Sequence, residues 1–393
     1  MRYFTLRDFN FINKRVLVRV DFNVPLNNKC NIVDDKRIKA ALPTINYLLE
    51  HKAQVILMSH LGRPKGKIVN NLRMDPIAKH LSMLLAEEVF KVDDCINIDI
   101  PNEKLVLLEN LRFHKEEEKN DMKFAKRLAN DADLYVNDAF GSCHRSHASV
   151  DAITNFLPSC AGFLLENEIT NLELKKPKKP YIGILGGAKI SDKIELIRSL
   201  LKKLDKLLLG GAMIFTFYKS QGIEIGKSLV EDNKLDLAQE LLDSYKKKLV
   251  LPIDIVIADK IDKKAKIKTV SVDKIPKNMY GVDIGEKSVK QFKNILAKAK
   301  TIIWNGPMGI FEIDKFATAT NEIAKCVANS KAKTIVGGGD SIAALDKLRL
   351  QNKMTHVSTG GGAFLEFIEG KHLPGITALE RNHHKFRESL HLF

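Results

Sequence analysis

The sequence contains no long apolar run. None of its 393 residues belongs to an uninterrupted apolar segment of about 18 residues, the length that a membrane-spanning helix needs. The opening segment, MRYFTLRDFN, also lacks the basic region followed by an apolar run that marks a secretory signal. We therefore expect a cytoplasmic protein with no membrane partner.

Cysteine is scarce, and its spacing excludes the common cysteine-based frameworks. The five cysteines are Cys30, Cys95, Cys143, Cys160 and Cys326. Their number is odd and they include no C-x-x-C pair, so they resemble reduced thiols of a cytosolic protein. Cys143, His144 and His147 suggest a thiol nucleophile or a zinc site, but the ligand spacing is incomplete and no second cluster completes it. We interpret them as loop residues beside Arg145.

Aromatic residues are also few, at 7% of the chain, although the net charge is +15. Such a charge suits nucleic acid, an anionic membrane or small anions. The aromatics do not interleave with the basic clusters, so the stacking platform of a single-strand binder is missing. Lysine runs such as 246–248 fall on the apparent outer faces of helices, where we interpret them as solvent-exposed charge. A nucleic-acid-binding protein is the alternative outside enzymes, and it predicts tight, salt-sensitive binding. We expect no nucleic-acid partner.

Two common nucleotide-binding motifs are absent. No G-x-G-x-x-G follows a predicted strand, which disfavours an NAD-dependent dehydrogenase, the alternative within enzymes. The segment 222–228, GIEIGKS, resembles the Walker phosphate loop, but the required first glycine falls on Gln221. A nucleotide site, if present, must therefore be built in another way.

Strands and helices alternate along the whole chain. Strands are predicted at 15–20, 54–59, 104–108, 133–136, 182–185, 206–209, 252–258, 301–304, 334–336 and 356–358, and a short hairpin arm at 266–275. Apolar residues at helical spacing lie between many of them, which predicts parallel sheets with helices on both faces. Because 393 residues exceed one ordinary core, we expect two domains. A helix at 162–174, followed by KKPKKP, is the natural connector.

Cations gather after the strands of the first half. Asp21 and Asn23 follow the strand 15–20. The cations are Arg37, His60, Arg63, Arg112 and Arg145, all on loops or helix starts. Ligands collect beyond the carboxyl ends of parallel strands, where such a cluster repels itself when empty. Arginine forks suit bidentate contact with phosphate or carboxylate, so we predict a site for a small, highly anionic ligand.

Glycines take the same place in the second half. Gly186 and Gly187 lie between a strand and a helix, with Ser191 or Asp192 as its expected N-cap and Lys189 and Lys193 beside it. Further glycine turns occur at 210–212, 305–312, 337–341 and 359–364. We expect each turn to expose backbone amides at a strand's carboxyl end, and the set to form a second anion site suited to polyphosphate.

The motifs that carry these residues resemble the phosphoglycerate kinase family over the full length of the chain. They are RVDFNVP (19–25), SHLGRP (59–64), ENLRF (109–113), NDAFGSCHRSHAS (137–149), GGAKISDK (186–193), WNGPMGIFE (304–312), GGGDS (337–341) and STGGGA (358–363). The resemblance implies a cytoplasmic, monomeric enzyme of glycolysis that transfers a phosphoryl group reversibly between 1,3-bisphosphoglycerate and ADP, giving 3-phosphoglycerate and ATP. It implies an α/β fold of two doubly wound, Rossmann-like domains joined by a hinge helix.

The resemblance also implies the domain boundaries and the roles of single residues. Residues 1–170 with the tail 377–393 would bind the phosphoglycerate, and residues 171–376 the nucleotide with Mg2+. The phosphoglycerate ligands would be Asp21, Asn23, Arg37, His60, Arg63, Arg112 and Arg145. The nucleotide ligands would be Lys193, Gly210, Gly211, Ala212, Asn305, Pro307, Glu312, Gly337, Gly338, Gly339, Asp340 and Ser341. Asp340 would hold the metal nucleotide and Glu312 the ribose, whereas Ala212 stands where many members carry a third glycine.

Phosphoryl transfer of this kind needs positioning and charge neutralisation more than acid–base chemistry. We assign neutralisation to Arg37, Lys189, Lys193 and the amides of Gly338 and Gly339, together with magnesium. Since these groups belong to different predicted domains, we expect catalysis to require closure about the hinge, which also excludes water.

Overall fold

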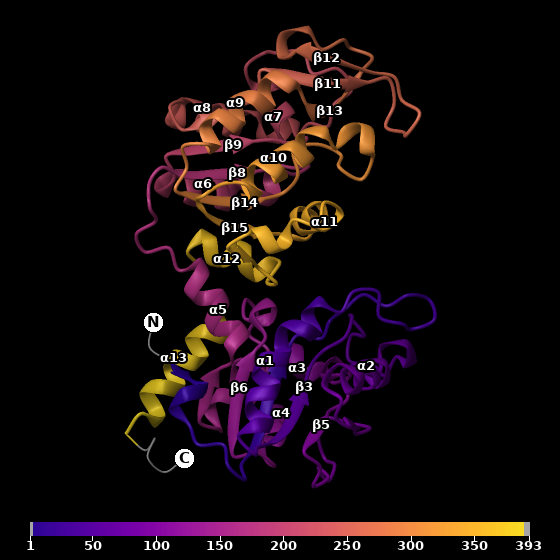
Figure 1. Ribbon diagram of the computed structural model, residues 1–393, viewed down its shortest axis with the longest axis vertical. Coiled ribbons are helices and arrows are strands. Elements are labelled where there is room, and N and C mark those ends of the chain that lie inside the picture. The colour runs from indigo at the N-terminus through magenta and orange to yellow at the C-terminus, as the bar shows by residue number, and fades with distance from the viewer. Residues whose placement is uncertain (1–2, 389–393) are drawn as a thin grey trace. The chain divides into compact units, whose positions relative to one another are not determined.

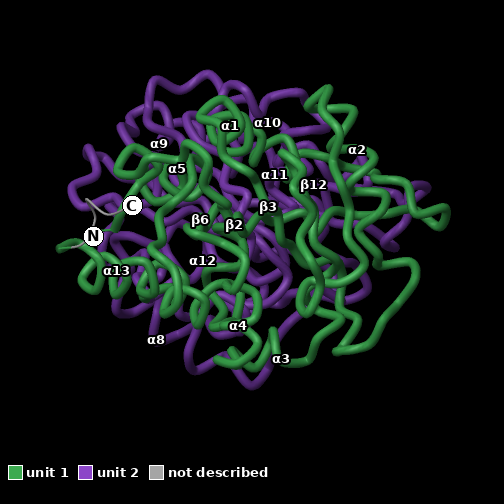
Figure 2. Tube along the Cα trace, turned by 90° about the horizontal axis from the view of Figure 1, so that it is seen from below, with its two compact units in different colours: residues 1–170, 372–393 green, residues 171–371 purple. Residues whose placement is uncertain are grey.

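The computed structural model describes residues 3–388 (Figure 1). The chain forms two compact units, residues 1–170 with 372–393 (unit 1) and residues 171–371 (unit 2) (Figure 2). No helix within residues 3–388 is long and apolar enough to cross a membrane. Residues 1–2 and 389–393, which the sequence assigns to the first domain, lie outside the described residues.

Unit 1 is built on a seven-stranded sheet, in the order β1-β7-β6-β2-β3-β5-β4, whose neighbouring strands are all parallel. The strands are β1 (Phe4–Thr5), β2 (Arg15–Val20), β3 (Gln54–Met58), β4 (Phe90–Lys91), β5 (Leu105–Leu107), β6 (Leu134–Asp138) and β7 (Ser159–Ala161). Val18 of β2 pairs with Leu57 and with Val136. The near-continuous apolar run of β2 is what a strand covered on both faces requires.

The helices of unit 1 come from both ends of the chain. They are α1 (Lys36–Glu50), α2 (Asp75–Leu85), α3 (Lys115–Glu118), α4 (Met122–Ala129) and α13 (Pro374–Phe386). Helix α13 is fastened to this unit by Asn382, which accepts a hydrogen bond from the Ser159 amide (2.9 Å) and donates one to the Leu157 carbonyl (2.8 Å). The end of the chain therefore returns to the first unit, as the resemblance implies.

Unit 2 holds a six-stranded parallel sheet, in the order β10-β9-β8-β14-β15-β16, and a separate antiparallel sheet, in the order β12-β11-β13. The strands are β8 (Tyr181–Leu185), β9 (Lys206–Leu209), β10 (Leu249–Val250), β11 (Asp254–Ala258), β12 (Ile267–Ser271), β13 (Tyr280–Ile284), β14 (Thr301–Asn305), β15 (Lys333–Gly337) and β16 (His356–Val357). The predicted hairpin arm is confirmed as β12. The strand predicted at 252–258 is β11, and it lies in the antiparallel sheet rather than the parallel one.

The helices of unit 2 include one whose start was predicted wrongly. They are α6 (Ile194–Lys203), α7 (Ile214–Ser220), α8 (Leu235–Tyr245), α9 (Glu286–Leu296), α10 (Thr318–Ala328), α11 (Gly339–Lys347) and α12 (Gly362–Glu369). Ser191 and Asp192 were the expected N-caps of α6, but both belong to a 3-10 turn and the capping position is Lys193. Ser191 is instead bound to Glu231, to which its amide and its hydroxyl both donate hydrogen bonds, at 3.0 and 2.5 Å.

Helix α5 (Phe163–Leu172) is the predicted connector, and it crosses the boundary between the units. Its start is anchored in unit 1, where the Asp138 carboxylate accepts from the amides of Leu164 (2.9 Å) and Leu165 (3.3 Å). Burial raises the pKa of Asp138 to about 7. The predicted α/β fold of two doubly wound parallel-sheet domains is confirmed.

Each parallel sheet reverses its strand order at one place. In unit 1 the chain leaves β2 toward β3 and later returns to β6 on the other side of β2; in unit 2 β9 and β14 flank β8 in the same way. Loops diverge at such a point and leave a crevice beyond the carboxyl ends of the strands. The loops after β2 and β6, and those after β8 and β14, therefore mark the place to search for a site in each unit.

Candidate active site

In unit 1, the loop after β2 is tied to the start of helix α1. The Nη1 atom of Arg37 donates to both carboxylate oxygens of Asp21, at 3.2 and 3.1 Å, and to the Asn23 carbonyl at 3.2 Å. The Asn23 side-chain oxygen accepts from the Gly62 amide at 2.9 Å. These described bonds all use one nitrogen of the Arg37 fork, so the rest of the guanidinium is available to an anion.

A buried arginine that sequence reasoning missed supports this loop. Arg19, at the end of β2, is fully buried and bonds the Ser149 hydroxyl (2.8 Å) and His60 Nδ1 (3.1 Å). Burial, together with Arg19 and other nearby cations, holds the pKa of His60 well below its usual value. His60 is therefore neutral; because its Nδ1 accepts from Arg19, its Nε2 carries the proton and can donate. Its place in RVLVRV, a strand whose apolar run predicts burial on both faces, could have indicated that Arg19 is buried as well.

Arg112 and a buried carboxylate complete the network. Arg112 is 6% exposed; its Nη1 donates to the Gly62 carbonyl at 2.8 Å, and its Nε lies 3.5 Å from Glu118. Glu117 is fully buried and accepts from the amide and the hydroxyl of Ser149, at 2.9 and 2.6 Å. The pKa of Glu117 is raised overall, because the effect of burial exceeds the opposing effects of Arg19 and these hydrogen bonds. Glu117 was not predicted, and it offsets part of the positive charge gathered here.

Two predicted ligands lie at the margin of this network. Arg63, next to Gly62, is exposed and has no bonding partner within residues 3–388. Arg145 is exposed and its Nε donates a hydrogen bond to His144 at 3.1 Å. The pKa of Arg112 is lowered mainly by burial, and the positive charge of nearby Arg145 adds to that effect. Cys143 beside them is a buried thiol whose pKa burial raises to about 12, so it is not an activated nucleophile. The predicted cations thus gather at one sheet edge, as a bonded core with two exposed arginines.

In unit 2, Lys193 is the cation placed at the centre of the glycine loops. Its ammonium group donates to the Gly186 carbonyl at 2.7 Å and to the Asn305 side-chain oxygen. Burial lowers its pKa to about 8, although Asp340 and Asp192 oppose that change. Lys189 is exposed on the same loop. Lys193 is therefore a partly desolvated cation held between the ends of β8 and β14.

Several of the glycine amides are bonded to other loops, which corrects the prediction that every turn exposes its amides. The amides of Gly186, Gly210 and Gly211 donate to carbonyls of Asn305, Leu185 and Met308, at 2.9, 2.9 and 2.8 Å. A Cβ on Gly186 would lie 1.8 Å from the Pro307 oxygen, and one on Gly211, whose φ is +70°, would lie 2.4 Å from Gly187. These glycines are needed because main chain packs on main chain there.

The start of helix α11 does offer free amides. Its capping residue, Gly338, has a φ of +96°, and a Cβ on Gly339 would meet open space. The first helical bond runs from the Ile342 amide to the Gly338 carbonyl (3.1 Å), so the earlier amides of the turn have no partner within the helix. Asn305 donates to the Gly337 carbonyl (2.8 Å), and the Ser341 hydroxyl accepts from the Gly306 amide (2.6 Å). Asn305, Gly337 and Ser341 thus hold the turn in place.

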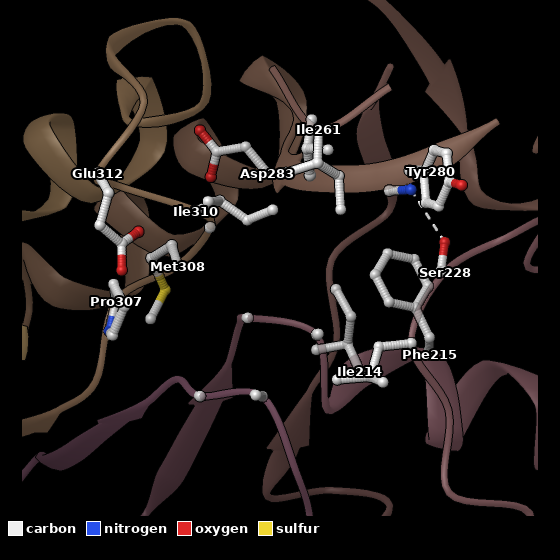
Figure 3. Close-up of a pocket in the computed structure, with 18 of the residues that line it drawn as sticks. Ile214, Phe215, Ser228, Ile261, Tyr280, Asp283, Pro307, Met308, Ile310 and Glu312 are labelled. Atoms are coloured by element: carbon white, nitrogen blue, oxygen red, sulfur yellow. Dashed lines mark hydrogen bonds between the residues drawn. The ribbon is translucent and has the colours of Figure 1, made fainter. Parts of the chain in front are cut away.

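A cavity of about 450 Å³ lies beside these loops (Figure 3). Its lining includes the predicted residues Gly211, Ala212, Pro307, Glu312 and Asp340, and also Ile214, Phe215, Leu229, Ile261, Tyr280, Val282, Met308 and Ile310. Figure 3 shows Glu312 and Pro307 on one side of it and Phe215 and Tyr280 on the other. The apolar walls were not predicted, because Tyr280 and Val282 belong to the antiparallel sheet, whose sequence carries no site motif.

The fold and these pockets define a class of protein. Each unit presents cations beyond the carboxyl edge of a parallel sheet, and unit 2 adds a largely apolar cavity large enough for a small ligand. Such a site binds anionic small molecules and can neutralise a phosphoryl group in transit. The class is that of an α/β phosphotransferase.

The chain belongs to the phosphoglycerate kinase family, whose model, described as phosphoglycerate kinase, matches residues 6–371. It is 54% identical over 383 residues to a phosphoglycerate kinase of Prochlorococcus marinus, with 93% of this chain and 95% of the relative covered. It is 51% identical to one of Moorella thermoacetica, with 96% and 99% covered. The solved structure of phosphoglycerate kinase from Coxiella burnetii is similar, with a TM-score of 0.91 at 41% identity and coverage of 97% and 99%.

The protein is accordingly a kinase of glycolysis. It transfers a phosphoryl group between 1,3-bisphosphoglycerate and ADP, giving 3-phosphoglycerate and ATP. Its substrates are small molecules, the phosphoglycerates and ADP or ATP.

Proposed function

We propose that unit 1 binds the phosphoglycerate and that unit 2 binds the nucleotide as its magnesium complex. The bonded cluster around Arg37, His60 and Arg112 carries the first assignment, because the nearby carboxylates offset only part of its positive charge and a compact anion would offset the rest. Its neutral His60 serves as a hydrogen-bond donor rather than as a further positive charge. Asp21, Asn23, Arg63 and Arg145 complete the proposed phosphoglycerate ligands; Asp21 and Asn23 act mainly by fixing Arg37 and the loop at Gly62.

The cavity of unit 2 carries the second assignment. Its apolar walls, with Phe215 and Ile310, suit a flat purine, and the carboxylate of Glu312 at its edge suits ribose hydroxyls. Gly211 and Ala212 line the cavity beside Gly187, which lies against the Lys193 side chain, and from there the phosphates would lead toward the start of α11. The walls contributed by Phe215 and Ile310 extend the set of nucleotide residues beyond the sequence motifs.

The residues beside this cavity fit a magnesium nucleotide. Asp340 is an exposed carboxylate in the first turn of α11 and lines the cavity. A magnesium ion bound to a nucleotide takes most of its ligands from water and phosphate oxygens. It therefore needs as little as one carboxylate from the protein. When bound, the ion would neutralise charge on the phosphates. Asp340 would orient it, while the neighbouring amides of Gly338 and Gly339 donate to phosphate oxygens.

The reaction itself asks for little proton transfer. In the direction of ATP use, a carboxylate oxygen of 3-phosphoglycerate forms a bond to the γ-phosphorus as the bond to ADP breaks; both oxygens are ionised and no proton must move. The protein must align the groups and neutralise the moving phosphoryl. We assign that task to Arg37 of unit 1 and to Lys189, Lys193, Gly338 and Gly339 of unit 2.

Because these groups belong to two units, we propose that the units close on their substrates about the connecting helix α5. Closure would exclude water, which otherwise hydrolyses the acyl phosphate. We further propose that the enzyme is a cytoplasmic monomer, as the resemblance to the family implies. Light scattering behind a sizing column measures that state; a dimer at working concentrations would contradict it.

The decisive assay measures ATP formed from ADP and 1,3-bisphosphoglycerate, with and without Mg2+. We expect formation that depends on the metal, and small-angle scattering should show a smaller radius of gyration with both substrates than with either alone. ATP formation at an equal rate in the presence of a chelator would refute the magnesium assignment. An unchanged radius with both substrates would refute closure.

A further inference from the structure

A group of possible metal ligands lies in unit 1 outside the proposed catalytic site. Asp94 and Cys95 belong to the connection between β4 and β5, and His114 precedes helix α3. The carboxylate, the thiol sulfur and a ring nitrogen lie within 4.8 Å of one another. His114 Nε2 is 2.6 Å from Asp94 Oδ1, which also accepts from the Cys95 amide at 2.6 Å. The imidazole of His114 and the amide of Cys95 therefore already meet at the Asp94 carboxylate, with the thiol sulfur close by.

We propose that Asp94, Cys95 and His114 form a binding site for a zinc ion. One sulfur, one nitrogen and one oxygen ligand make a borderline-soft donor set, which suits Zn2+ and disfavours Mg2+. Ligand atoms in a tetrahedral zinc site are separated by roughly 3–4 Å, so the cluster needs only a small adjustment to reach that geometry. Three protein ligands leave the fourth position to water.

The charges balance when the ion binds. The thiol of Cys95 loses its proton to solvent as sulfur bonds the metal, and the Nε2 lone pair of a neutral His114 takes the place of its contact with Asp94. One thiolate and one carboxylate then neutralise one divalent ion, with no change of oxidation state. Because a cysteine binds metal as its thiolate, binding should release about one proton and tighten as pH rises.

The position of the site predicts what the ion does. His114 follows Arg112 and Phe113 in the chain, whereas Asp94 and Cys95 come from the connection that precedes β5. An ion bound by all three would cross-link the two segments and stabilise unit 1, with an effect that grows as the logarithm of the free ion concentration above the Kd. Its effect is on the fold that supports Arg112, and it is separate from the magnesium of the nucleotide.

The test uses Co2+ as an absorbing probe of the full-length chain, with Zn2+ as competitor. We expect one Co2+ per chain, with the near-ultraviolet absorbance of a thiolate–metal bond, and displacement by Zn2+ but not by a hundredfold excess of Mg2+. Cys95→Ser should abolish the band, and Asp94→Asn should weaken binding at least tenfold. Cys326→Ser, which removes a half-buried thiol of unit 2, should change neither.

Because Cys95 is buried, Cys95→Ser could lose the ion by disturbing the fold. Asp94→Asn controls for this, because the Asp94 side chain is 44% exposed and its replacement should leave the fold intact. The thermal unfolding midpoint should rise with Zn2+ in the parent and in Cys326→Ser but not in Asp94→Asn. Absence of the thiolate band in the parent, its persistence in Cys95→Ser, or equal zinc stabilisation of Asp94→Asn would each overturn the proposal.

Discussion

The two units provide for anions by different physical means. Unit 1 uses side chains: Arg19, His60 and Glu117 are buried and bonded, and they support the arginines that meet solvent. Unit 2 uses main chain: glycines let the loops after β8, β9 and β14 pack together, and the start of α11 supplies amides. A charged cluster thus needs buried partners to hold it, whereas an amide site needs only the close approach that glycine permits.

The largest effect should come from Lys193, the half-buried cation at the centre of the glycine loops. Replacing it by Ala should lower kcat by a factor on the order of 10²–10³, because it removes a preorganised donor from the phosphoryl path. KM for the nucleotide should change far less. Lys202→Ala, an exposed residue of the same helix, is the control. A coupled assay that found unchanged turnover would remove Lys193 from the mechanism.

The packing role of the glycines can be separated from a ligand role by two matched substitutions. Gly211→Ala should lower the free energy of unfolding by at least about 2 kcal/mol, because its φ is +70° and the new methyl group would meet Gly187. Gly339→Ala, which meets open space, should change it by no more than about 0.5 kcal/mol. Equal denaturation curves for the two variants would contradict this division.

In unit 1, the exposed arginines should affect binding without affecting the fold. Arg63→Ala should lower kcat/KM for 3-phosphoglycerate by about tenfold, because it removes one charge-assisted hydrogen bond to the ligand. The KM for nucleotide should not change. Its unfolding midpoint should match that of the parent, since Arg63 has no bonding partner within the described chain. Arg127→Ala, another exposed arginine of unit 1, is the control. A lower midpoint with normal kcat/KM would reverse the interpretation.

The smallest effect expected is a difference in pH dependence between the two substrates. The pKa of Lys193 in the free enzyme is about 8, so its cationic form is lost as pH rises through that value. Between pH 7 and 9, kcat/KM for nucleotide should fall several-fold. That for phosphoglycerate, measured at saturating nucleotide whose phosphates hold Lys193 in its cationic form, should stay flat, because arginines do not titrate there. Parallel profiles for both substrates, or a fall that persists in Lys193→Ala, would argue against this pKa assignment.

The sequence predicted the sheets better than it predicted what surrounds the ligands. Strands such as β2 and β8 were predicted because their apolar runs are continuous. β1 and β10, with two residues each, were missed, and so was β13, whose YGVDI includes a glycine and an aspartate. Arg19 was missed because an arginine inside a strand gives no local sign of its buried partners. The glycine turns were located correctly, but contacts between distant loops decide whether an amide is free, and no single turn encodes them.

The same limit applies to the nucleotide cavity. Phe215 and Tyr280 become neighbours only through the antiparallel sheet, whose strands carry no nucleotide motif. Their aromatic and apolar character resembles that of ordinary core positions, so spacing alone could not distinguish them. The assignment of roles to the predicted site residues remains our proposal, and the substitutions above test it.

The central claim is that one phosphoryl group is neutralised by residues of both units. The most direct test measures kcat of Arg37→Ala at saturating concentrations of both substrates. Lys39→Ala, in the same helix α1, is the control. We predict that kcat of Arg37→Ala falls by about 10²-fold, as for the loss of a transition-state contact, while Lys39→Ala keeps the parental value. A kcat for Arg37→Ala equal to that of the parent would contradict the claim.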